Sequence, residues 1–426
     1  MPSPVNSLSD LVLSPGLLEF DAQIGPKSHR LWIKGEGGEA GAVTPHADSA
    51  LALGLVPAMT EGGVLRVEGE VSPRVLRMQR EFQGIERAWS LGWNSGAPPL
   101  EEVAVEAGMR TIPAPDRNDR VAAFFSGGVD SWATLLSEPE ITDLIFVKGV
   151  DILPSLTPLH VGLGERVEAA LGEVAAEMGK RLHVVEVNIR EFSEPLIEWG
   201  FFFNSTLSAI ALYFEPLFDR VLIPSDTNHL NQPPYGSSRM IDGLWSSEAI
   251  EIVDHGGRLT RIERIRLIAQ NPLVQRSLRV CYMNHDRLYN CGRCPKCNYT
   301  MICLEALGMR AKFTTFPDEF DFTVLEDYVP AEQIHLVLWE EALQLVEECA
   351  REDLAAVVRP LVERGRRNLT DPALIAAAEE ASAAQEEAAA VRAQLNEVLG
   401  STSWRATEPL RRAGIIARKA RTRLRG

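Results

Sequence analysis

Residues 121–136, VAAFFSGGVDSWATLL, run from an apolar stretch into a Ser-Gly-Gly turn and then, after Asp130, into a second apolar pattern. The first stretch, residues 121–125, is short and ends at a turn signal, so it predicts a buried strand. Residues 131–138 have the spacing of an amphipathic helix. A strand that passes through glycines into a helix is typical of an α/β fold.

Short apolar runs continue to alternate with amphipathic stretches after this point. The alternation predicts the fold class, which is an α/β fold with a parallel, doubly wound sheet. The expected strands are residues 121–125, 143–148, 182–187 and 220–224, and the expected helices are residues 131–138, 162–179 and 204–215. Because ligands bind beyond the carboxyl ends of the strands in such sheets, the glycine turn lies at an expected ligand site.

The glycine turn itself predicts an anion cradle. Gly127 and Gly128 can adopt backbone angles closed to other residues, and they allow a ligand to approach the main chain closely. The amides from Val129 onward lie at a helix N-terminus, where partial positive charge favours phosphate. Ser126 and Ser131 add hydroxyl donors. The alternative is a tight strand–helix connection that binds no ligand.

Asp130 adds a carboxylate to this cradle. Since a carboxylate beside bound phosphate is repulsive unless a cation lies between them, we assign Asp130 to Mg²⁺, which would bridge it to a polyphosphate. Lys148, at the end of the second expected strand, is a further candidate for contact with the phosphates.

Residues 126–131, Ser-Gly-Gly-Val-Asp-Ser, match an SGGxDS loop, and in this the chain resembles the PP-loop superfamily of ATP pyrophosphatases. The resemblance implies an adenine nucleotide α-hydrolase-like fold. It also implies cleavage of ATP between its α and β phosphates, with transfer of AMP to a substrate oxygen while the loop holds pyrophosphate. The superfamily includes synthetases that form amides through acyl-adenylates and enzymes that thiolate tRNA.

Four of the six cysteines lie within residues 281–297: Cys281, Cys291, Cys294 and Cys297. Two overlapping C-x-x-C steps place three thiolates on one tight turn, and Cys281 supplies a fourth. Four sulfur ligands in a reducing compartment predict tetrahedral Zn²⁺. A closed site of this kind has no position for water, so its role should be structural.

Other interpretations of the cysteines remain open: a disulfide pair, an iron–sulfur cluster, or His285 as the fourth ligand. Arg293 and Lys296 would offset part of the negative charge of the thiolates. Cys303 and Cys349 lie on helical patterns and are predicted to be buried thiols.

One cysteine followed by C-x-x-C-x-x-C, downstream of the ATP loop, is similar to the 7-cyano-7-deazaguanine synthases of queuosine biosynthesis. Those enzymes adenylate a carboxylate and use ammonia. Residues 203–205 and 220–224 also resemble that family, which implies a nucleotide-binding role for Asn204. The similarity covers about residues 120–310. Residues 225–250 depart from the deazapurine-recognition segment, so ATP and Zn²⁺ carry over and the deazaguanine substrate does not.

Residues 225–248 follow the fourth expected strand, so they should lie over the same sheet edge as the glycine turn. Arg239 could bind a carboxylate or phosphate as a bidentate partner. Asp242 could bind a second Mg²⁺ or orient a nucleophile, and Trp245 could stack on a ring or belong to the core. Further polar and aromatic side chains of the segment are Asp226, His229, Tyr235 and Ser237. The candidate catalytic residues are Asp130, Ser131, Arg239 and Asp242.

The sequence as a whole predicts four parts. Residues 1–118 read as a β-rich accessory domain with a helix near 74–90. Residues 119–325 form the PP-loop domain with the cysteine cluster, and one arginine of an expected helix over 258–266 could face the leaving phosphate. Residues 326–400 read as a helical extension. Residues 401–426 form a basic amphipathic tail.

The composition limits the partners. The net charge is −16, but residues 401–426 carry +7, so residues 1–400 carry −23. This acidic body argues against nucleic acid, while the tail could bind an anionic membrane or a protein. The Ala- and Glu-rich residues 372–399 could pair as a coiled coil and form a homo-oligomer. No long apolar span or signal-peptide pattern is present, which predicts a cytoplasmic protein.

Three functions follow as hypotheses. The first is a ligase in which a small-molecule carboxylate attacks the α-phosphate of Mg·ATP and ammonia or an amine then attacks the acyl-adenylate. The second is a tRNA thiolase in which the cysteines carry sulfur or hold an iron–sulfur cluster. The third is a non-catalytic partner protein that binds nucleotide.

Overall fold

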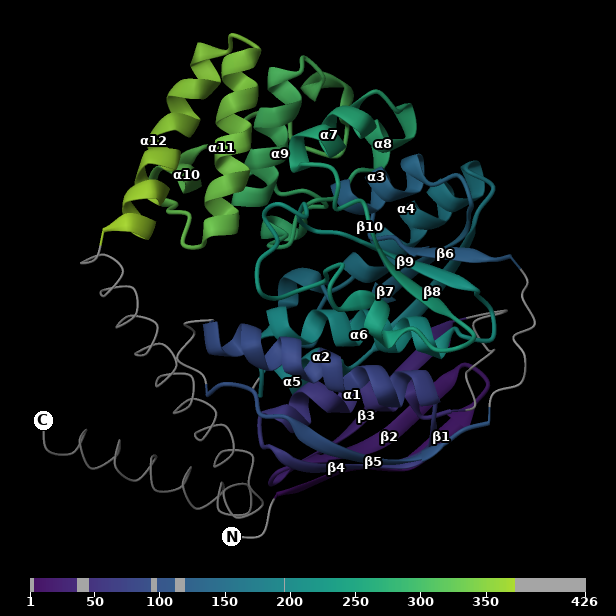
Figure 1. Ribbon diagram of the computed structural model, residues 1–426. Helices are drawn as coiled ribbons and strands as arrows, with labels where there is room; N and C mark the ends of the chain where they lie inside the picture. The colour runs from purple at the N-terminus through teal and green to yellow at the C-terminus, as the bar shows by residue number, and fades with distance from the viewer. Residues whose placement is uncertain (1–3, 37–45, 93–97, 112–118, 195, 372–426) are drawn as a thin grey trace, which may run out of the picture. The chain divides into compact units, whose positions relative to one another are not determined.

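A ten-stranded sheet runs through the computed structural model, which describes residues 4–36, 46–92, 98–111, 119–194 and 196–371 (Figure 1). The strand order is β10-β9-β6-β7-β8-β3-β2-β1-β4-β5. The strands are β1 (Val5–Ser14), β2 (Leu17–Ile24), β3 (Lys27–Glu36), β4 (Gly63–Val71), β5 (Val103–Met109), β6 (Val121–Phe124), β7 (Ile141–Lys148), β8 (Arg181–Val187), β9 (Arg220–Pro224) and β10 (Glu251–His255). The helix predicted over 372–399 and the tail 401–426 lie outside the described residues.

The sheet is mostly parallel. Strands β10, β9, β6, β7 and β8 are parallel to one another. An antiparallel pairing of β3 with β8 joins them to the antiparallel meander β3-β2-β1, and β1, β4 and β5 are again parallel. The predicted α/β class is confirmed. The segment that the sequence indicates as an accessory domain, residues 1–118, therefore shares one sheet with the middle of the chain.

Helices cover both faces of the sheet (Figure 1). On one face lie α3 (Val129–Ser137), α4 (Leu163–Glu177), α7 (Arg261–Ala269), α8 (Pro272–Ser277), α9 (Pro295–Ala306), α11 (Gln333–Glu348) and α12 (Glu352–Thr370). On the other lie α1 (Asp48–Met59), α2 (Pro73–Gly92), α5 (Ile189–Ser193) and α6 (Trp199–Tyr213), while α10 (Thr323–Asp327) packs near α12. With helices on both sides, β6 is buried along its whole length, as parallel strands usually are.

The predicted elements of the middle of the chain are confirmed. The four expected strands correspond to β6–β9, and the expected helices to α3, α4 and α6, while α2 covers residues 74–90. Strand β10 was missed because its sequence, EIVDH, is short and polar at both ends. Helices α11 and α12 confirm the helical prediction for residues 333–370, and Trp339 of α11 packs edge-on against Tyr299 of α9, with ring centroids 5.4 Å apart.

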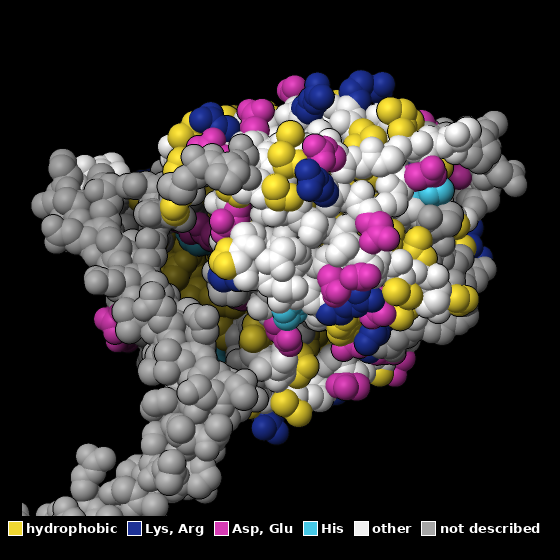
Figure 2. All heavy atoms as spheres, turned by 90° about the horizontal axis from the view of Figure 1, so that it is seen from below, with side chains coloured by type: hydrophobic (Ala, Val, Ile, Leu, Met, Phe, Trp, Pro, Cys, Tyr) yellow, Lys and Arg dark blue, Asp and Glu magenta, His cyan; other side chains and the backbone are white. Residues whose placement is uncertain are grey.

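Charged side chains of both signs are intermixed on the face shown in Figure 2, and no broad area of a single sign is visible there. Among the described residues, none of the helices combines the length and the apolar character needed to cross a membrane.

A buried carboxylate ties the central strands together. Asp143 of β7 is fully buried and accepts hydrogen bonds from Arg120 (2.7 Å) and Arg181 (2.8 Å), and it contacts His183 at 2.8 Å. Burial alone would raise the pKa of Asp143, but its hydrogen bonds with His183, Arg181 and Arg120 outweigh burial and lower the pKa well below the ordinary value. Asp143 is therefore ionised, and Arg120 and Arg181 compensate its negative charge.

We expect Asp143→Ala to lower the free energy of unfolding by about 3 kcal/mol, because it leaves the cationic partners without their acceptor. Glu140→Ala, which removes the exposed partner of Arg220, should cost less than about 1 kcal/mol. Urea unfolding curves of both variants measure the difference, and equal effects would contradict the assignment.

Candidate functional site

A cavity of about 560 Å³ lies beyond the carboxyl ends of β6, β7 and β9. Its size is in the range of small-molecule sites, and its place is the one expected for a ligand of a parallel sheet. The glycine turn lines one side, and the first turns of α6, α9 and α11 line others. The lining includes Ser126, Gly128, Val129, Asp130, Ser131, Asp226, Arg261, Arg279, Lys296, Trp199, Phe203, Tyr235 and Leu338.

Only one of the two glycines needs an unusual backbone angle. Gly127 has φ +76°, a left-handed conformation that disfavours other residues. Gly128 has φ −80° and ψ 171°, which any residue can adopt, so the prediction of special angles is wrong for Gly128. At Gly128 the constraint is space, since a Cβ atom would lie 3.3 Å from Ser126 Oγ.

Helix α3 begins at Val129, and no described side chain caps its N-terminus. The first backbone N–H groups of a helix lack intrahelical acceptors, so here they can serve an anion in the cavity. The Ser131 hydroxyl donates to the Gly128 carbonyl oxygen at 3.1 Å. This hydrogen bond closes the turn on itself.

Asp130 is paired with two arginines from α7. Its Oδ2 accepts from Arg261 Nη1 at 2.7 Å, and its Oδ1 accepts from Arg264 Nη1 at 2.6 Å. Burial works to raise the pKa of Asp130, but the charges of Arg261 and Arg264 prevail and lower it. The counter-cations that the structure shows at this carboxylate are therefore guanidinium groups. Arg261, from the helix that the sequence indicated, also lines the cavity.

Arg279 is a site residue that sequence reasoning missed. Its backbone N–H donates to the Gly127 carbonyl oxygen at 2.9 Å, and the residue lines the cavity. The residue is only 6% exposed, and no described residue accepts a hydrogen bond from its buried Nε and Nη2 atoms. Burying donors without acceptors is costly, so this guanidinium points to an anionic ligand.

Asp226 faces the same group of charges. Burial, followed by the negative charge of Asp130, raises the pKa of Asp226 to about 6. Its Oδ1 atom is buried and has no described donor. Asp130 and Asp226 thus differ in proton affinity although they line one cavity. The Asp130 carboxylate is paired with two guanidinium groups, whereas no described donor reaches Asp226 Oδ1.

Asp226→Asn should stabilise the protein more at pH 7 than at pH 5. A folded-state pKa above the unfolded value of 3.8 means that ionisation of Asp226 opposes folding. The gain from the variant should therefore grow by about 1 kcal/mol as the pH rises through 6. Urea unfolding of both proteins at pH 5, 6, 7 and 8 measures this gain, and a gain that does not change with pH would contradict the shifted pKa.

Several predicted site residues lie elsewhere. Asp242 is buried in a network in which it accepts hydrogen bonds from Asn204 Nδ2 (2.6 Å), Ser237 Oγ (2.5 Å) and the Ser238 N–H (2.8 Å). Burial raises the pKa of Asp242 well above its usual range. Neither Asp242 nor Asn204 is among the described residues that line the cavity. The network fastens the segment after β9 to α6, so these two residues are brought together in a structural role.

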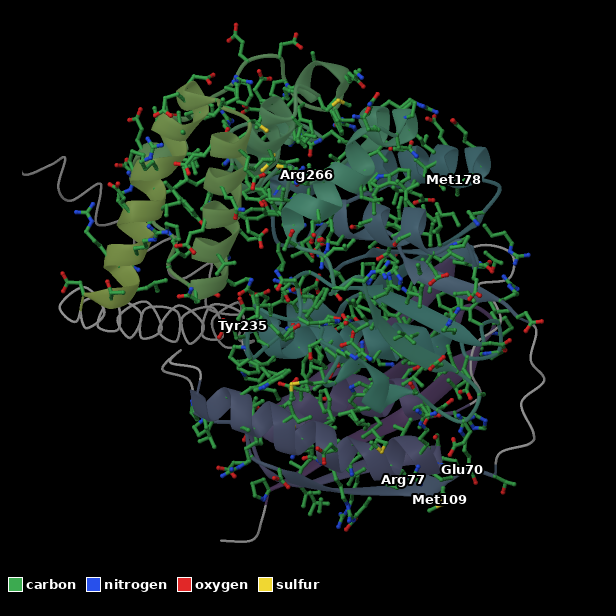
Figure 3. All side chains as sticks on the ribbon, turned by 45° about the horizontal axis from the view of Figure 1, so that its top comes forward. Glu70, Arg77, Met109, Met178, Tyr235 and Arg266 are labelled. Atoms are coloured by element: carbon green, nitrogen blue, oxygen red, sulfur yellow. The ribbon has the colours of Figure 1, made fainter. Side chains whose placement is uncertain are left out.

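Arg239 is exposed and Lys148 pairs with Glu168 at 3.1 Å, and neither is among the described lining residues. Trp245 packs edge-on against Phe82 in the core, with ring centroids 4.9 Å apart, so the core interpretation is confirmed. From the same segment the structure brings Tyr235 to the cavity. Its hydroxyl donates to Glu332 Oε2 at 2.7 Å, which links the segment after β9 to the segment before α11. The Tyr235 ring lies against Gly200 at the start of α6, and Tyr235 is labelled in Figure 3.

The four clustered cysteines come together as a candidate metal centre. The sulfur atoms of Cys281, Cys291, Cys294 and Cys297 are buried and lie within 4.8 Å of one another. Cys281 Sγ and Cys294 Sγ are 3.9 Å apart, close to the spacing of about 3.8 Å that four Zn–S bonds of about 2.3 Å impose on a tetrahedron. All are free thiols, which excludes the disulfide interpretation in this structure.

The thiols cannot all ionise without a cation. Hydrogen bonds with Cys281, Cys294 and Cys297 lower the pKa of Cys291, whereas those with Cys281 and Cys291 raise the pKa of Cys294 and of Cys297. Backbone N–H groups donate to three of the sulfurs, at Cys281, Cys291 and Cys294. Such a donor set fits a bound metal such as Zn²⁺. His285 lies outside the cluster, and Cys303 is buried as expected, while Cys349 is half-buried.

We expect one zinc per chain and no labile sulfide, and we expect Cys294→Ser to lower the zinc content well below one. Zinc should be released as the pH falls, because protons compete for the thiolates. Elemental analysis with a sulfide assay tests this. Iron with stoichiometric sulfide would contradict the zinc assignment and favour the iron–sulfur interpretation.

Comparison with known proteins gave no match: no family model, no curated protein and no solved structure is significantly similar to the chain.

Proposed function

We propose that the chain is an ATP-dependent, AMP-forming ligase of the PP-loop type, which activates a carboxylate as an acyl-adenylate and transfers it to ammonia or an amine. The resemblance of residues 126–131 and the cavity around that turn support the proposal. The finer fold assignment, a doubly wound sheet of the adenine nucleotide α-hydrolase type, belongs to the same proposal. The parallel run β10-β9-β6-β7-β8 with helices on both faces supports it.

The observation that carries the proposal is Arg279, a cavity-lining residue whose backbone borders the glycine turn and whose buried guanidinium has no described acceptor for Nε and Nη2. A pyrophosphate group offers several charged oxygens, which suit both a guanidinium fork and the uncapped amides at the start of α3. Lys296, in the first turn of α9, adds an ammonium group to the guanidinium and the backbone amides as a third kind of hydrogen-bond donor at the same cavity. A neutral ligand would leave these donors uncompensated.

Asp130 and Asp226 are the residues that would hold Mg²⁺. They fit because the buried Asp226 Oδ1 has no described donor and carboxylate oxygens are the ligands that this cation prefers. When bound, Mg²⁺ would neutralise charge on the polyphosphate. Arg261, now paired with Asp130, would then be placed to contact phosphate oxygens from the cavity wall.

The contribution of the chain to the reaction is positioning and charge stabilisation. Amides of the turn and of α3 would hold the departing pyrophosphate, and Arg279 with Lys296 would stabilise its developing charge. The apolar part of the cavity, formed by Trp199, Phe203 and Leu338, would receive the acceptor acid. Its carboxylate would then face the α-phosphate from the side opposite the leaving group.

The test is incubation of the full chain with ATP, Mg²⁺, ammonium and a panel of carboxylic acids. An active acid should yield AMP and pyrophosphate in equal amounts. Arg279→Ala should lower this rate by roughly 100-fold, since a charge-stabilising donor is lost. The control is Arg276→Ala, which removes an exposed arginine of α8 that pairs with Glu177 of α4. This variant should leave the rate unchanged.

Formation of ADP and phosphate in place of AMP and pyrophosphate would contradict the proposed cleavage. So would an unchanged rate in Arg279→Ala, because the proposal makes this side chain a direct contact of the leaving group.

A further inference from the structure

The cysteine cluster and the glycine turn are joined by the main chain. Arg279, whose N–H donates to the Gly127 carbonyl oxygen at 2.9 Å, lies two residues before Cys281. The segment that supplies the first sulfur atom of the cluster is thus the segment that borders the anion cradle. A change in the position of Cys281 would be transmitted to Arg279 over a few covalent bonds.

Asn290 holds this segment from the other side of the cluster. Its Oδ1 accepts from the N–H groups of Val280 (2.8 Å) and Cys281 (3.2 Å), and its Nδ2 donates to the Leu278 carbonyl oxygen at 2.8 Å. Asn290 directly precedes Cys291. Residues 278–281 and 290–297 are therefore fastened together twice, by the Asn290 amide and by the four sulfur atoms.

The second cavity cation of this region belongs to the cluster as well. Lys296 lies between Cys294 and Cys297 in the first turn of α9, and it lines the cavity. Arg279 has no described side-chain acceptor that could fix its guanidinium. The placement of both cations consequently depends on the backbone that the four thiols hold.

We propose that the four-cysteine metal centre is a positioning element of the anion site, so that metal occupancy sets the affinity of the cavity for pyrophosphate. Without a metal, the four sulfur atoms lose the common ligand that would join residues 278–281 to residues 290–297. Arg279 and Lys296 then lose their fixed place at the cavity. The inference uses only one part of the proposed function, the binding of pyrophosphate at the turn.

The experiment is calorimetric titration of pyrophosphate into the full chain, with zinc bound and after removal of zinc by a chelator. We expect binding to be at least tenfold weaker in the zinc-free chain, while the far-UV circular dichroism spectrum is retained. The double variant Arg279→Ala/Lys296→Ala, with zinc bound, should show a similar loss. In that variant the removal of zinc should change the affinity less than twofold, because coupled effects are not additive.

The control is Arg276→Ala/Lys312→Ala, which removes two exposed positive charges away from the cavity. It should bind pyrophosphate as the wild type does, with the full dependence on zinc. This comparison separates the position of the cations from their contribution to net charge.

Equal affinity of the zinc-bound and zinc-free chains would overturn the inference, and so would an undiminished zinc effect in Arg279→Ala/Lys296→Ala. If the zinc-free chain unfolds, Asn290→Ala replaces it, since this variant keeps all four thiols. It should bind one zinc but bind pyrophosphate several-fold more weakly, and wild-type affinity would refute the coupling.

Zinc-dependent pyrophosphate binding without any AMP formation would refute the proposed ligase activity and leave the coupling between zinc and pyrophosphate binding standing. Absence of pyrophosphate binding to the zinc-bound wild type would refute both.

Discussion

The buried guanidinium of Arg264 is the constraint on which the geometry of the cavity depends. It is 1% exposed, and it donates to Asp130 Oδ1 and to the carbonyl oxygens of Ser225, Thr227 and Gly256. Such a group must satisfy its donors inside the protein. These acceptors come from α3, from the segment after β9 and from the turn after β10, so Arg264 joins two parts of the cavity wall to each other and to the turn after β10 before any ligand arrives. The wall is therefore preorganised, a condition under which charge stabilisation is most effective.

Preorganisation explains why charges of both signs coexist in a small volume. Asp130 keeps Arg261 and Arg264 in place, and Asp226 remains with an unpaired oxygen because the arginines are turned toward its neighbour. Arg279 enters from a separate segment and has no described carboxylate partner. The cavity thus contains one satisfied ion-pair cluster, together with a donor, the Arg279 guanidinium, and an acceptor, Asp226 Oδ1, that remain unsatisfied. The unsatisfied pair marks where a ligand with its own charges would fit.

The sequence was sufficient for features that depend on local pattern. Strands β6–β9, the turn at Gly127 and the cluster of Cys281 with the C-x-x-C-x-x-C run were predictable, because periodicity and ligand spacing act over a few residues. It was insufficient for features set by topology. Nothing near Arg279 indicates that it borders Gly127, since the two are joined only by the fold. Asp242 and Arg239 shared a loop with Asp226, yet chain direction alone could not show that Asp226 faces the cavity, Asp242 faces the core and Arg239 faces solvent.

The antiparallel pairing of β3 with β8 has a consequence for how the protein is made. Residues 33 and 187 are direct partners, so one edge of β3 has no partner strand to hydrogen-bond with until β8 has left the ribosome. During that interval the meander β1-β2-β3 carries an open edge with apolar side chains, the type of surface that pairs with other chains. Pairing of two strands that lie so far apart in the sequence is also slow. Elongation rate and holding chaperones should therefore decide how much of the newly made chain reaches its native sheet.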